Sequence, residues 1–302
     1  MIEFLRKCVY VPRAIWRNPS NHGERWRRLG VFLAWQVRKR LVRRPLTVAV
    51  FNGLRFKVYP DCQVSPGFIY YRMPECEDIA FIREHIQGGV LVDIGANVGS
   101  VSILLGDRVQ HGLLFEPNPV AAARARENLA LNQLAFEVHE LALSDSSGTV
   151  ELENSGGVNS SNRTVVGFKS AKPTRLVPRM TFDDFLRGRP PLEISIVKID
   201  VEGHENAVLR GMRGFLRERR PRLVMFEYLQ RTNLAETVGI FESAGYCVFE
   251  LGKTGPSLLR AEVEPLQNLF ACPVELAEEF GLARAERTSV ASPAKVGGRQ
   301  LF

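Results

Sequence analysis

The stretch that decides the fold is Val90-Leu-Val-Asp-Ile-Gly-Ala-Asn-Val-Gly-Ser100. Its first five residues are mostly branched and apolar, which predicts a buried strand, and the two glycines that follow predict a sharp turn into a helix. Ligands of open α/β sheets bind at the carboxyl ends of the strands. Asp93 stands at that end, where its carboxylate can accept a hydrogen bond from a ligand ammonium group. The stretch therefore predicts a ligand site.

A second carboxylate supports this interpretation. Glu116 ends the next strand, 23 residues after Asp93, where it can accept hydrogen bonds from both hydroxyls of a ribose. A nicotinamide dinucleotide requires the pattern G-x-G-x-x-G, but Asn97 stands where the second glycine is expected. A ligand without phosphates does not need that close approach, and an acidic turn suits a cationic amino-acid group. The pattern favours S-adenosylmethionine over a dinucleotide, and over a glycine turn that only packs a helix on a strand.

Strand and helix signals alternate on both sides of this turn, which favours a parallel sheet covered by helices on both faces. The helices are predicted to begin at Asn118-Pro119, and to span Thr232 to Ala244 with a stop at Gly245. Two late strands separated only by a loop are predicted to pair antiparallel at one edge. The predicted strands are Val90–Ile94, Leu113–Glu116, Phe136–Leu141, Ile194–Ile199, Leu223–Phe226, Tyr246–Leu251 and Asn268–Cys272.

The basic charge is concentrated at the N-terminus. Residues 1–44 hold twelve Lys or Arg and two Glu, a sum of +10, whereas the other 258 residues hold 28 basic and 31 acidic side chains, a sum of −3. Trp26, Leu29, Leu33, Val37 and Leu41 recur at helical spacing among the arginines. Two interpretations remain open: a basic amphipathic helix on an anionic membrane surface, or a helix packed on the body with a solvated basic face. We expect no nucleic-acid partner, because no motif for one is present.

The 302 residues, 45% apolar and 24% charged, exclude collagen-like, coiled-coil and wholly disordered proteins. No apolar run reaches the roughly 18 residues of a membrane span, and Arg6 and Lys7 interrupt any signal-peptide core. Five scattered cysteines predict reduced thiols and a cytoplasmic protein, peripheral at the membrane if the arm binds lipid. We expect a basic helical arm (1–44), a β-hairpin around Asn52-Gly53 with a lead-in segment (45–88), a catalytic domain (89–275), a mobile loop (154–162) and a disordered tail (284–302).

At this point the sequence resembles the FkbM-type S-adenosylmethionine-dependent methyltransferases, over roughly residues 75 to 250. The most specific match is Val197-Lys-Ile-Asp-Val-Glu-Gly-His-Glu205. The others are Asp93-Ile-Gly-Ala-Asn-Val-Gly99, Phe115-Glu-Pro-Asn-Pro119, Ala142-Leu-Ser-Asp145 with Gly148, Met180-Thr-Phe-Asp-Asp-Phe185, and Glu227 after Leu223-Val-Met-Phe226.

The resemblance implies a Rossmann-like, seven-stranded class I methyltransferase sheet and methyl transfer, usually to a hydroxyl of a sugar, glycan or other natural product. It implies that Asp93, Ile94, Gly95, Ala96, Asn97 and Gly99 surround the methionine part of S-adenosylmethionine. By the same resemblance, Glu116 and Pro117 lie at the ribose, and Ala142, Leu143 and Asp145 border the adenine. His204 departs from the family, which more often has a small residue there.

A hydroxyl acceptor must lose a proton, so we expect a general base that contributes roughly 10²- to 10⁴-fold. Asp200, Glu202, His204 and Glu227 lie at or just beyond strand ends and are the candidates. Neighbouring carboxylates can raise one pKa toward neutrality, although they also suit a metal ion or the cofactor ammonium; we expect no metal. Lys198 lies inside a predicted buried strand, which indicates an ion pair with an acid.

Three functions are compatible with such a sheet, because a fold alone does not fix a function. The leading one is an S-adenosylmethionine-dependent O-methyltransferase. The second is an NAD(P)-dependent oxidoreductase on a similar sheet, and the third is a non-catalytic protein that binds lipid or glycan. The acidic residues at the strand ends argue against the third.

Overall fold

A computed structural model describes residues 2–153, 164–165, 173–252, 254–259 and 265–282. The predicted mobile loop (154–162) and the predicted tail (284–302) lie outside the described residues. No helix in the described ranges has both the length and the apolarity needed to cross a bilayer.

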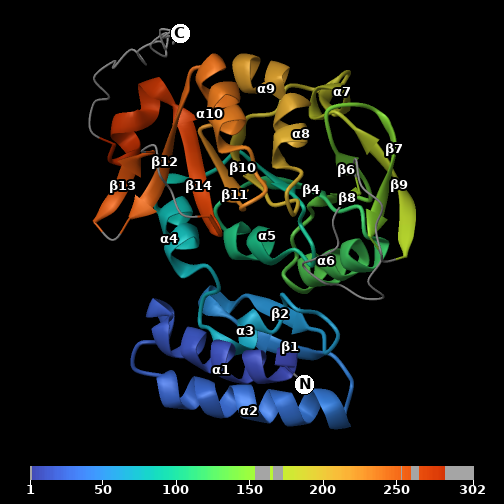
Figure 1. The fold of residues 1–302 in the computed structure, drawn as a ribbon, viewed down its shortest axis with the longest axis vertical. Helices are drawn as coiled ribbons and strands as arrows, with labels where there is room; N and C mark the ends of the chain where they lie inside the picture. The colour runs from blue at the N-terminus through green and yellow to red at the C-terminus, as the bar shows by residue number, and fades with distance from the viewer. Residues whose placement is uncertain (1, 154–163, 166–172, 253, 260–264, 283–302) are drawn as a thin grey trace, which may run out of the picture.

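An eight-stranded sheet forms the centre of the molecule, in the order β13-β12-β14-β11-β10-β3-β4-β5 (Figure 1). Strands β11, β10, β3, β4 and β5 are parallel, and β14, β12 and β13 add antiparallel at one edge. The bounds are β3 Val90–Ile94, β4 His111–Phe115, β5 Glu137–His139, β10 Ile194–Ile199, β11 Leu223–Tyr228, β12 Tyr246–Gly252, β13 Gly255–Leu258 and β14 Gln267–Pro273. The predicted parallel sheet and its antiparallel edge pair are confirmed.

The prediction of seven strands needs one correction, because β13 adds an eighth at the edge. After Gly252 the chain turns back and pairs Leu251 with Pro256. Proline lacks a backbone donor and is tolerated in an edge strand, where one side of the strand needs no partner. The segment has neither apolar alternation nor length, so its sequence gave no strand signal.

Helices cover both faces of this sheet (Figure 1). On β3, Leu91 packs into the hydrophobic cluster of one face, while Val92 and Ile94 pack into the cluster of the other. The first face carries α4 Cys76–His85, α5 Ser100–Leu105 and α6 Pro119–Leu131; the second carries α7 Phe182–Leu186, α8 Glu205–Arg210, α9 Arg213–Glu218 and α10 Leu234–Ser243, and a 3₁₀ segment, η3 Val274–Phe280, follows β14. The predicted start of α6 is confirmed, because Asn118 caps the helix. The helix predicted from Thr232 to Ala244 is α10, which runs from Leu234 to Ser243, and the predicted stop Gly245 follows it with φ 79°.

A small second sheet lies beside β5 and was not expected from the sequence. Its order is β6-β9-β7-β8, with bounds β6 Ala142–Leu143, β7 Gly148–Glu153, β8 Thr164–Val165 and β9 Thr174–Met180. The strand predicted over Phe136–Leu141 is shorter, because β5 ends at His139 and the chain then passes into β6. This change of sheet brings Ala142 and Leu143 to the edge where β3 and β4 end.

The N-terminal layer, which we define as residues 10–70, lies at one end of the molecule (Figure 1). It contains most of α1 Ile2–Arg17, then η1 Pro19–Asn21, α2 Arg25–Leu41, β1 Leu46–Ala49, η2 Phe51–Gly53, β2 Arg55–Val58 and α3 Gly67–Tyr70. The predicted hairpin is confirmed: β1 and β2 pair antiparallel around Asn52 and Gly53, which have φ angles of 55° and 75°.

Helix α2 packs on this layer through a face that the sequence did not single out. Phe32 and Trp35 are buried, whereas Trp26, Leu33 and Val37 of the predicted apolar face are exposed. The helix therefore carries two apolar faces, and the one that contains two large aromatic side chains is used for packing. The helix is packed on the body, as one of the two interpretations held, but its solvent side carries large apolar side chains as well as basic ones.

Candidate active site

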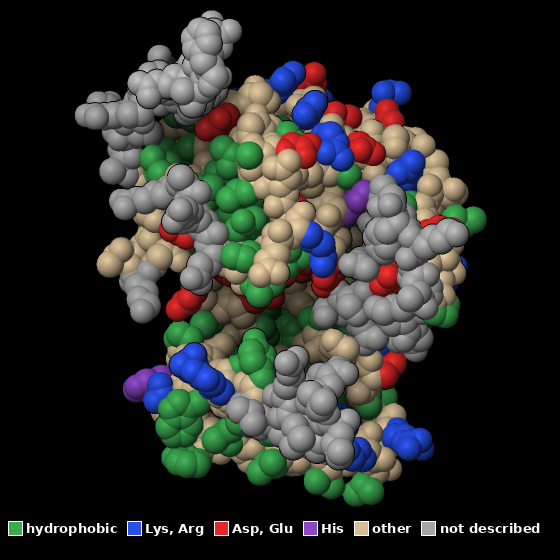
Figure 2. Space-filling model, viewed as in Figure 1, with side chains coloured by type: hydrophobic (Ala, Val, Ile, Leu, Met, Phe, Trp, Pro, Cys, Tyr) green, Lys and Arg blue, Asp and Glu red, His purple; other side chains and the backbone are tan. Residues whose placement is uncertain are grey.

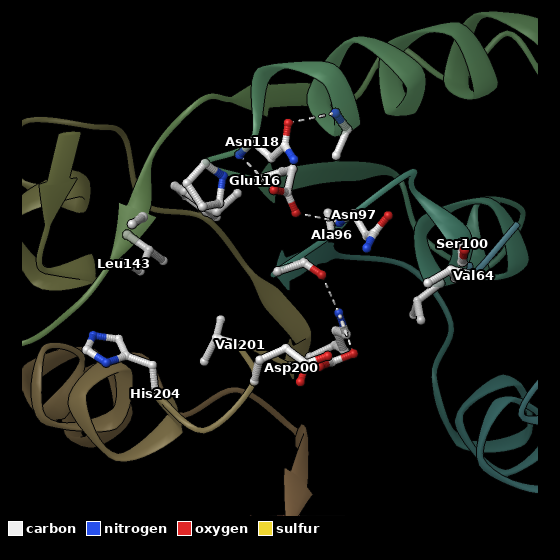
Figure 3. A pocket seen from close by; sticks show the side chains of 18 of the residues that line it. Val64, Ala96, Asn97, Ser100, Glu116, Asn118, Leu143, Asp200, Val201 and His204 are labelled. Carbon is white, nitrogen blue, oxygen red and sulfur yellow. Dashed lines mark hydrogen bonds and ion pairs between the residues drawn. The ribbon is translucent and has the colours of Figure 1, made fainter. Parts of the chain in front are cut away.

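A pocket opens at the carboxyl ends of β3, β4 and β10, between the N-terminal layer and the central sheet (Figures 2 and 3). It brings together most of the residues predicted to bind the cofactor: Gly95, Ala96, Asn97, Glu116, Pro117, Ala142 and Leu143. It also brings together three of the predicted catalytic residues: Asp200, Glu202 and His204. The lining does not include Asp93, Ile94, Gly99, Asp145 or Glu227.

The glycine turn after β3 is shaped by the neighbouring strand. Gly95 has φ 75°, and a Cβ atom built there would lie 1.8 Å from the carbonyl oxygen of Asp200. Glycine is therefore required for the end of β3 to meet the chain just after β10. Gly99 has φ 81° and precedes the first residue of α5. The space that a side chain at position 95 would need is filled by the backbone of Asp200, and the backbone of Gly95 itself lines the pocket.

Asp93 is part of a buried ion pair. Its side chain is fully buried, accepts a hydrogen bond of 2.6 Å from Ser102 Oγ and lies 3.3 Å from Lys198 Nζ. Lys198 also donates to the Gly95 carbonyl at 2.7 Å and lies 3.6 Å from the Asp200 carboxylate. The predicted ion pair of Lys198 is thus confirmed. Asp93 does not itself line the pocket, and its contact with a ligand ammonium stays a prediction.

The charge of Lys198 is secured by its neighbours. Burial alone would lower the pKa of its ammonium group, but the carboxylates of Asp93 and Asp200 outweigh burial and raise it. Lys198 therefore remains protonated at neutral pH. A charged lysine beneath the pocket offsets part of the negative charge that lines it.

Glu116 is held at the top of β4 by two backbone amides (Figure 3). One carboxylate oxygen accepts from the Asn118 amide at 2.8 Å and the other from the Asn97 amide at 2.9 Å. Burial raises the pKa of Glu116 to about 7, although both amides act to lower it. Each oxygen retains a second lone pair, so the carboxylate can still accept hydrogen bonds from two ligand hydroxyls.

Two polar atoms in the pocket wall have no partner within the described residues. Asn97 Oδ1 and Ser100 Oγ are both buried, and both residues line the pocket. Buried polar atoms in native proteins are nearly always hydrogen-bonded. These atoms therefore fit a ligand that carries polar groups at the end of the glycine turn.

The opposite wall is apolar. Pro117, Leu141, Ala142, Leu143 and Leu152 line the pocket on the side of β6 and β7. A flat aromatic base is favoured by such a wall, since pockets for small ligands combine apolar surface with a few placed polar groups. The lining thus fits S-adenosylmethionine: apolar at the adenine, a carboxylate at the ribose, and unpartnered polar and acidic groups at the cationic methionine end.

A cluster of four carboxylates, which we call the acidic rim, lies at the other end of the pocket: Glu75, Asp200 and Glu202 line the pocket, and Glu227 lies next to Asp200. Desolvation and the charge of Asp200 raise the pKa of Glu75 and of Glu202 to about 7. Glu227 lies within hydrogen-bonding reach of Asp200, and desolvation together with that carboxylate raises its pKa to about 8. Arg231 lies 3.3 Å from the Glu202 carboxylate. The rim can therefore hold and release protons near neutral pH.

Glu75 is the acid that the sequence did not reveal. It lies immediately before α4 in the left-handed conformation, with φ 49°, and lines the pocket together with Val64 of the N-terminal layer. Its side chain is exposed at the open mouth, while the pocket walls around it restrict its hydration enough to shift its pKa. No motif contains Glu75, and its distance in sequence from Asp200 gives no periodic signal.

His204 lies at the other side of the pocket, just before α8. Its Nε2 is 3.0 Å from Ser144 Oγ, and burial lowers the pKa of its imidazole, so the ring is neutral at pH 7. Asp145 accepts two hydrogen bonds from Arg210 and thereby links the chain after β6 to α8. Within the described ranges, no group of three or more His, Cys, Asp or Glu side chains is arranged to hold a metal ion.

Comparisons with known proteins identify a family for this chain. The model of the methyltransferase FkbM domain matches residues 93–248. Hexuronic acid methyltransferase AglP of Haloferax volcanii is 28% identical over 131 residues, 43% of this chain and 53% of that protein, so the match spans about half of the relative's length. The crystal structure of methyltransferase FkbM from Methylobacillus flagellatus is 16% identical, with a TM-score of 0.42 over 61% of this chain and 43% of that one. M. jannaschii TYW2 in complex with AdoMet is 16% identical, with a TM-score of 0.40 over 76% and 84% of the two chains.

Proposed function

The chain belongs to the FkbM methyltransferase family, and from this premise we propose that it methylates a hydroxyl group of a sugar, a glycan or a similar hydroxylated natural product. It is an S-adenosylmethionine-dependent methyltransferase. The observation that carries the finer proposal is the acidic rim, whose members Glu75, Glu202 and Glu227 have pKa values of about 7 to 8 beside the pocket.

The cofactor, when bound, supplies a methyl group on a positively charged sulfur that is already a good leaving group. Glu116 would hold the ribose, Ala142 and Leu143 would contact the adenine, and Asn97 and Ser100 would bond the methionine part. The protein's remaining task is to orient the acceptor, exclude water and remove one proton. Orientation contributes on the order of 7 to 11 kcal/mol at best.

Removal of the proton from the acceptor hydroxyl is the step for which the acidic rim is suited. A hydroxyl group must lose its proton as it attacks, and a base whose pKa lies near the working pH is the most effective acceptor for it. An ordinary glutamate, with a pKa near 4.5, is too weak a base for this task. Glu202 lines the pocket directly, and Asp200 connects it to Glu227. We assign proton removal to this pair of glutamates, with Asp200 as the charge that raises both pKa values.

A carboxylate acceptor is less compatible with the site. It is already ionised at neutral pH and needs no base, and the acidic rim would repel it. The similarity to a hexuronic acid methyltransferase supports a sugar as acceptor. A hexuronic acid carries both hydroxyls and a carboxylate, and the charge of the rim favours methylation of a hydroxyl.

Treatment with alkali distinguishes a methyl ether, formed on a hydroxyl, from a methyl ester, formed on a carboxylate. The test is to incubate the protein with S-adenosylmethionine labelled in its methyl group and a panel of neutral and uronic-acid glycans, and then to treat the products with mild alkali. A methyl ether keeps the label, whereas a methyl ester releases it as methanol. We expect alkali-stable label and no transfer by the Glu202→Gln variant above one hundredth of the parent rate. Label released entirely by alkali would refute hydroxyl methylation.

The proposal includes a cytoplasmic location. The described cysteines Cys62, Cys76, Cys247 and Cys272 are all free thiols. Free thiols are typical of a reducing compartment. Blocking of these thiols by a membrane-impermeant alkylating reagent in intact cells would contradict a cytoplasmic location.

A further inference from the structure

The outward face of α2 carries apolar side chains that no other described residue covers. Trp26, Leu33, Val37 and Leu41 are 57% to 78% exposed, and their spacing places them along one side of the helix. Trp16 of α1 extends the row, because its ring centroid lies 5.2 Å from that of Trp26. We call these five residues the outer stripe. Single exposed apolar side chains are common, but a contiguous row of this kind marks an interaction surface.

The outer stripe is not needed for packing. Helix α2 already anchors itself through Phe32 and Trp35, which belong to the same hydrophobic cluster as Phe56 and Phe68. Tyr70 of α3 packs edge to face on Phe32 and receives a hydrogen bond from Gln36. One side of the helix thus attaches it to the protein, and the other side presents large apolar groups to the exterior.

Arginines border the outer stripe. Arg13, Arg17, Arg43 and Arg44 are exposed, and none has an acidic partner among the described residues. Glu24 is the one acidic residue in the sequence from 10 to 45, and it pairs with Arg27 and Arg28. Figure 2 shows apolar and basic side chains together along this end of the molecule. The combination of an apolar row and a cationic border is typical of helices that lie in the membrane interface.

We propose that the outer stripe and its arginine border bind the surface of an anionic lipid bilayer, with the axis of α2 in the membrane plane. A second copy of the chain is a poorer occupant, because residues 1–44 carry a charge of +10 and two such faces repel each other. An anionic bilayer provides an apolar environment for the outer stripe and negatively charged headgroups for the arginines. The proposal does not depend on which acceptor is methylated.

The first test is sedimentation of the full chain with vesicles. Vesicles of one part phosphatidylglycerol to three parts phosphatidylcholine should bind the parent protein, and vesicles of phosphatidylcholine alone should bind it at least tenfold less. The variant Leu33→Ser/Val37→Ser/Leu41→Ser should bind at least tenfold less, and Arg43→Gln/Arg44→Gln about fivefold less for each arginine removed. Because all these side chains are exposed, the thermal unfolding midpoints should match that of the parent.

A matched control replaces exposed apolar side chains elsewhere. Val120, Leu176 and Val274 are 49% to 66% exposed and lie outside the N-terminal layer. The variant Val120→Ser/Leu176→Ser/Val274→Ser removes a similar apolar area and should bind vesicles like the parent. Equal loss in this control would mean that binding reflects general hydrophobicity and would overturn the proposal.

Tryptophan fluorescence locates the contact. Trp16 and Trp26 of the outer stripe are exposed, whereas Trp35 is buried, so insertion of the stripe should shift the emission to the blue through Trp16 and Trp26. Trp16→Phe/Trp26→Phe should keep vesicle binding and lose most of the shift. The proposal is overturned if the parent fails to sediment with anionic vesicles at low salt, or if the triple serine variant binds as the parent does. It is also overturned if light scattering shows that the parent is a dimer and the triple serine variant a monomer, while the parent does not bind vesicles.

Discussion

Glu116 shapes the end of the pocket where we propose that the ribose binds, because its side chain connects two loops. Its carboxylate accepts hydrogen bonds from the backbone amides of Asn97, after β3, and of Asn118, after β4. Glu116→Gln keeps the volume but places an NH₂ group against one of these amides. We expect S-adenosylmethionine affinity, measured by calorimetry, to fall about 10- to 100-fold, as is typical when a hydrogen bond to a charged group is lost.

The control for this substitution is Glu140→Gln, since Glu140 is an exposed residue paired with Arg126 outside the pocket. Its cofactor affinity should equal that of the parent. Parent affinity in Glu116→Gln as well would separate Glu116 from the cofactor and would leave the pocket without its ribose anchor.

The acidic rim should govern how turnover depends on pH. A base works only when ionised, so turnover should be full above the pKa of the rim and should fall tenfold per pH unit below about 7. Asp200→Asn removes the carboxylate that, after desolvation, does most to raise the pKa values of Glu202 and Glu227. The acid limb of this variant should therefore move to lower pH. An unchanged limb would show that Asp200 does not raise the pKa of the catalytic base.

Two strands are joined by one buried charge pair. Asp93 on β3 and Lys198 on β10 lie 3.3 Å apart with side chains at most 7% exposed. Asp93→Asn keeps the acceptor for Ser102 but leaves the lysine with only the partly exposed Asp200. Breaking a buried pair costs about 3 to 5 kcal/mol, which should appear as a lower free energy of unfolding in a denaturant titration. This substitution is thus a test of folding rather than of cofactor binding.

An exposed pair is the proper comparison. Arg222 and Glu279 lie 2.7 Å apart and are about half exposed. Glu279→Gln should cost less than about 1 kcal/mol, because water screens exposed pairs. If Asp93→Asn cost no more than Glu279→Gln, the buried ion pair would add nothing to the stability that the backbone pairing of β3 and β10 provides.

At the scale of elements, the sequence predicted those strands, turns and helix caps that depend on residues close together in the chain. The strands β3 and β10, the Asn52-Gly53 turn and the cap at Asn118 follow from branched apolar runs and from residues suited to particular backbone angles. Helix α2 shows the limit of this reasoning. Its sequence contains two apolar faces, and periodicity cannot tell which of them meets the body. The choice depends on Phe56 and Phe68, which lie far along the chain and pack in the same cluster.

The same limit applies to the site. Asn97, Glu116 and Glu202 belong to motifs and were predicted, because motif residues follow strand ends whose positions the sequence reveals. Asp93 shares its motif with Asn97 but turned out to be buried, since its partner Lys198 lies on a strand about a hundred residues away. Glu75 belongs to no motif, and only the packing of the N-terminal layer against the sheet brings it to the pocket.

At the scale of the whole molecule, the N-terminal layer and the central sheet form one hydrophobic body. Phe56 and Phe68 of the layer stack with ring centroids 3.7 Å apart, and they share a cluster with Leu91 of β3. Val64, which lies between them in the sequence, and Glu75, just before α4, both line the pocket. The layer is therefore positioned to respond when the pocket is filled.

Hydrogen exchange can detect that response. S-adenosylmethionine should slow amide exchange in the glycine turn (95–100) and also in residues 64–75, because both stretches contribute residues to the pocket lining. Amides of α2 between Phe32 and Leu41 should not change, since that helix contributes no residue to the pocket lining. In Glu116→Gln at the same cofactor concentration both protections should weaken together. Protection confined to the glycine turn would mean that the ligand is held by the sheet alone, with Glu75 outside the working site.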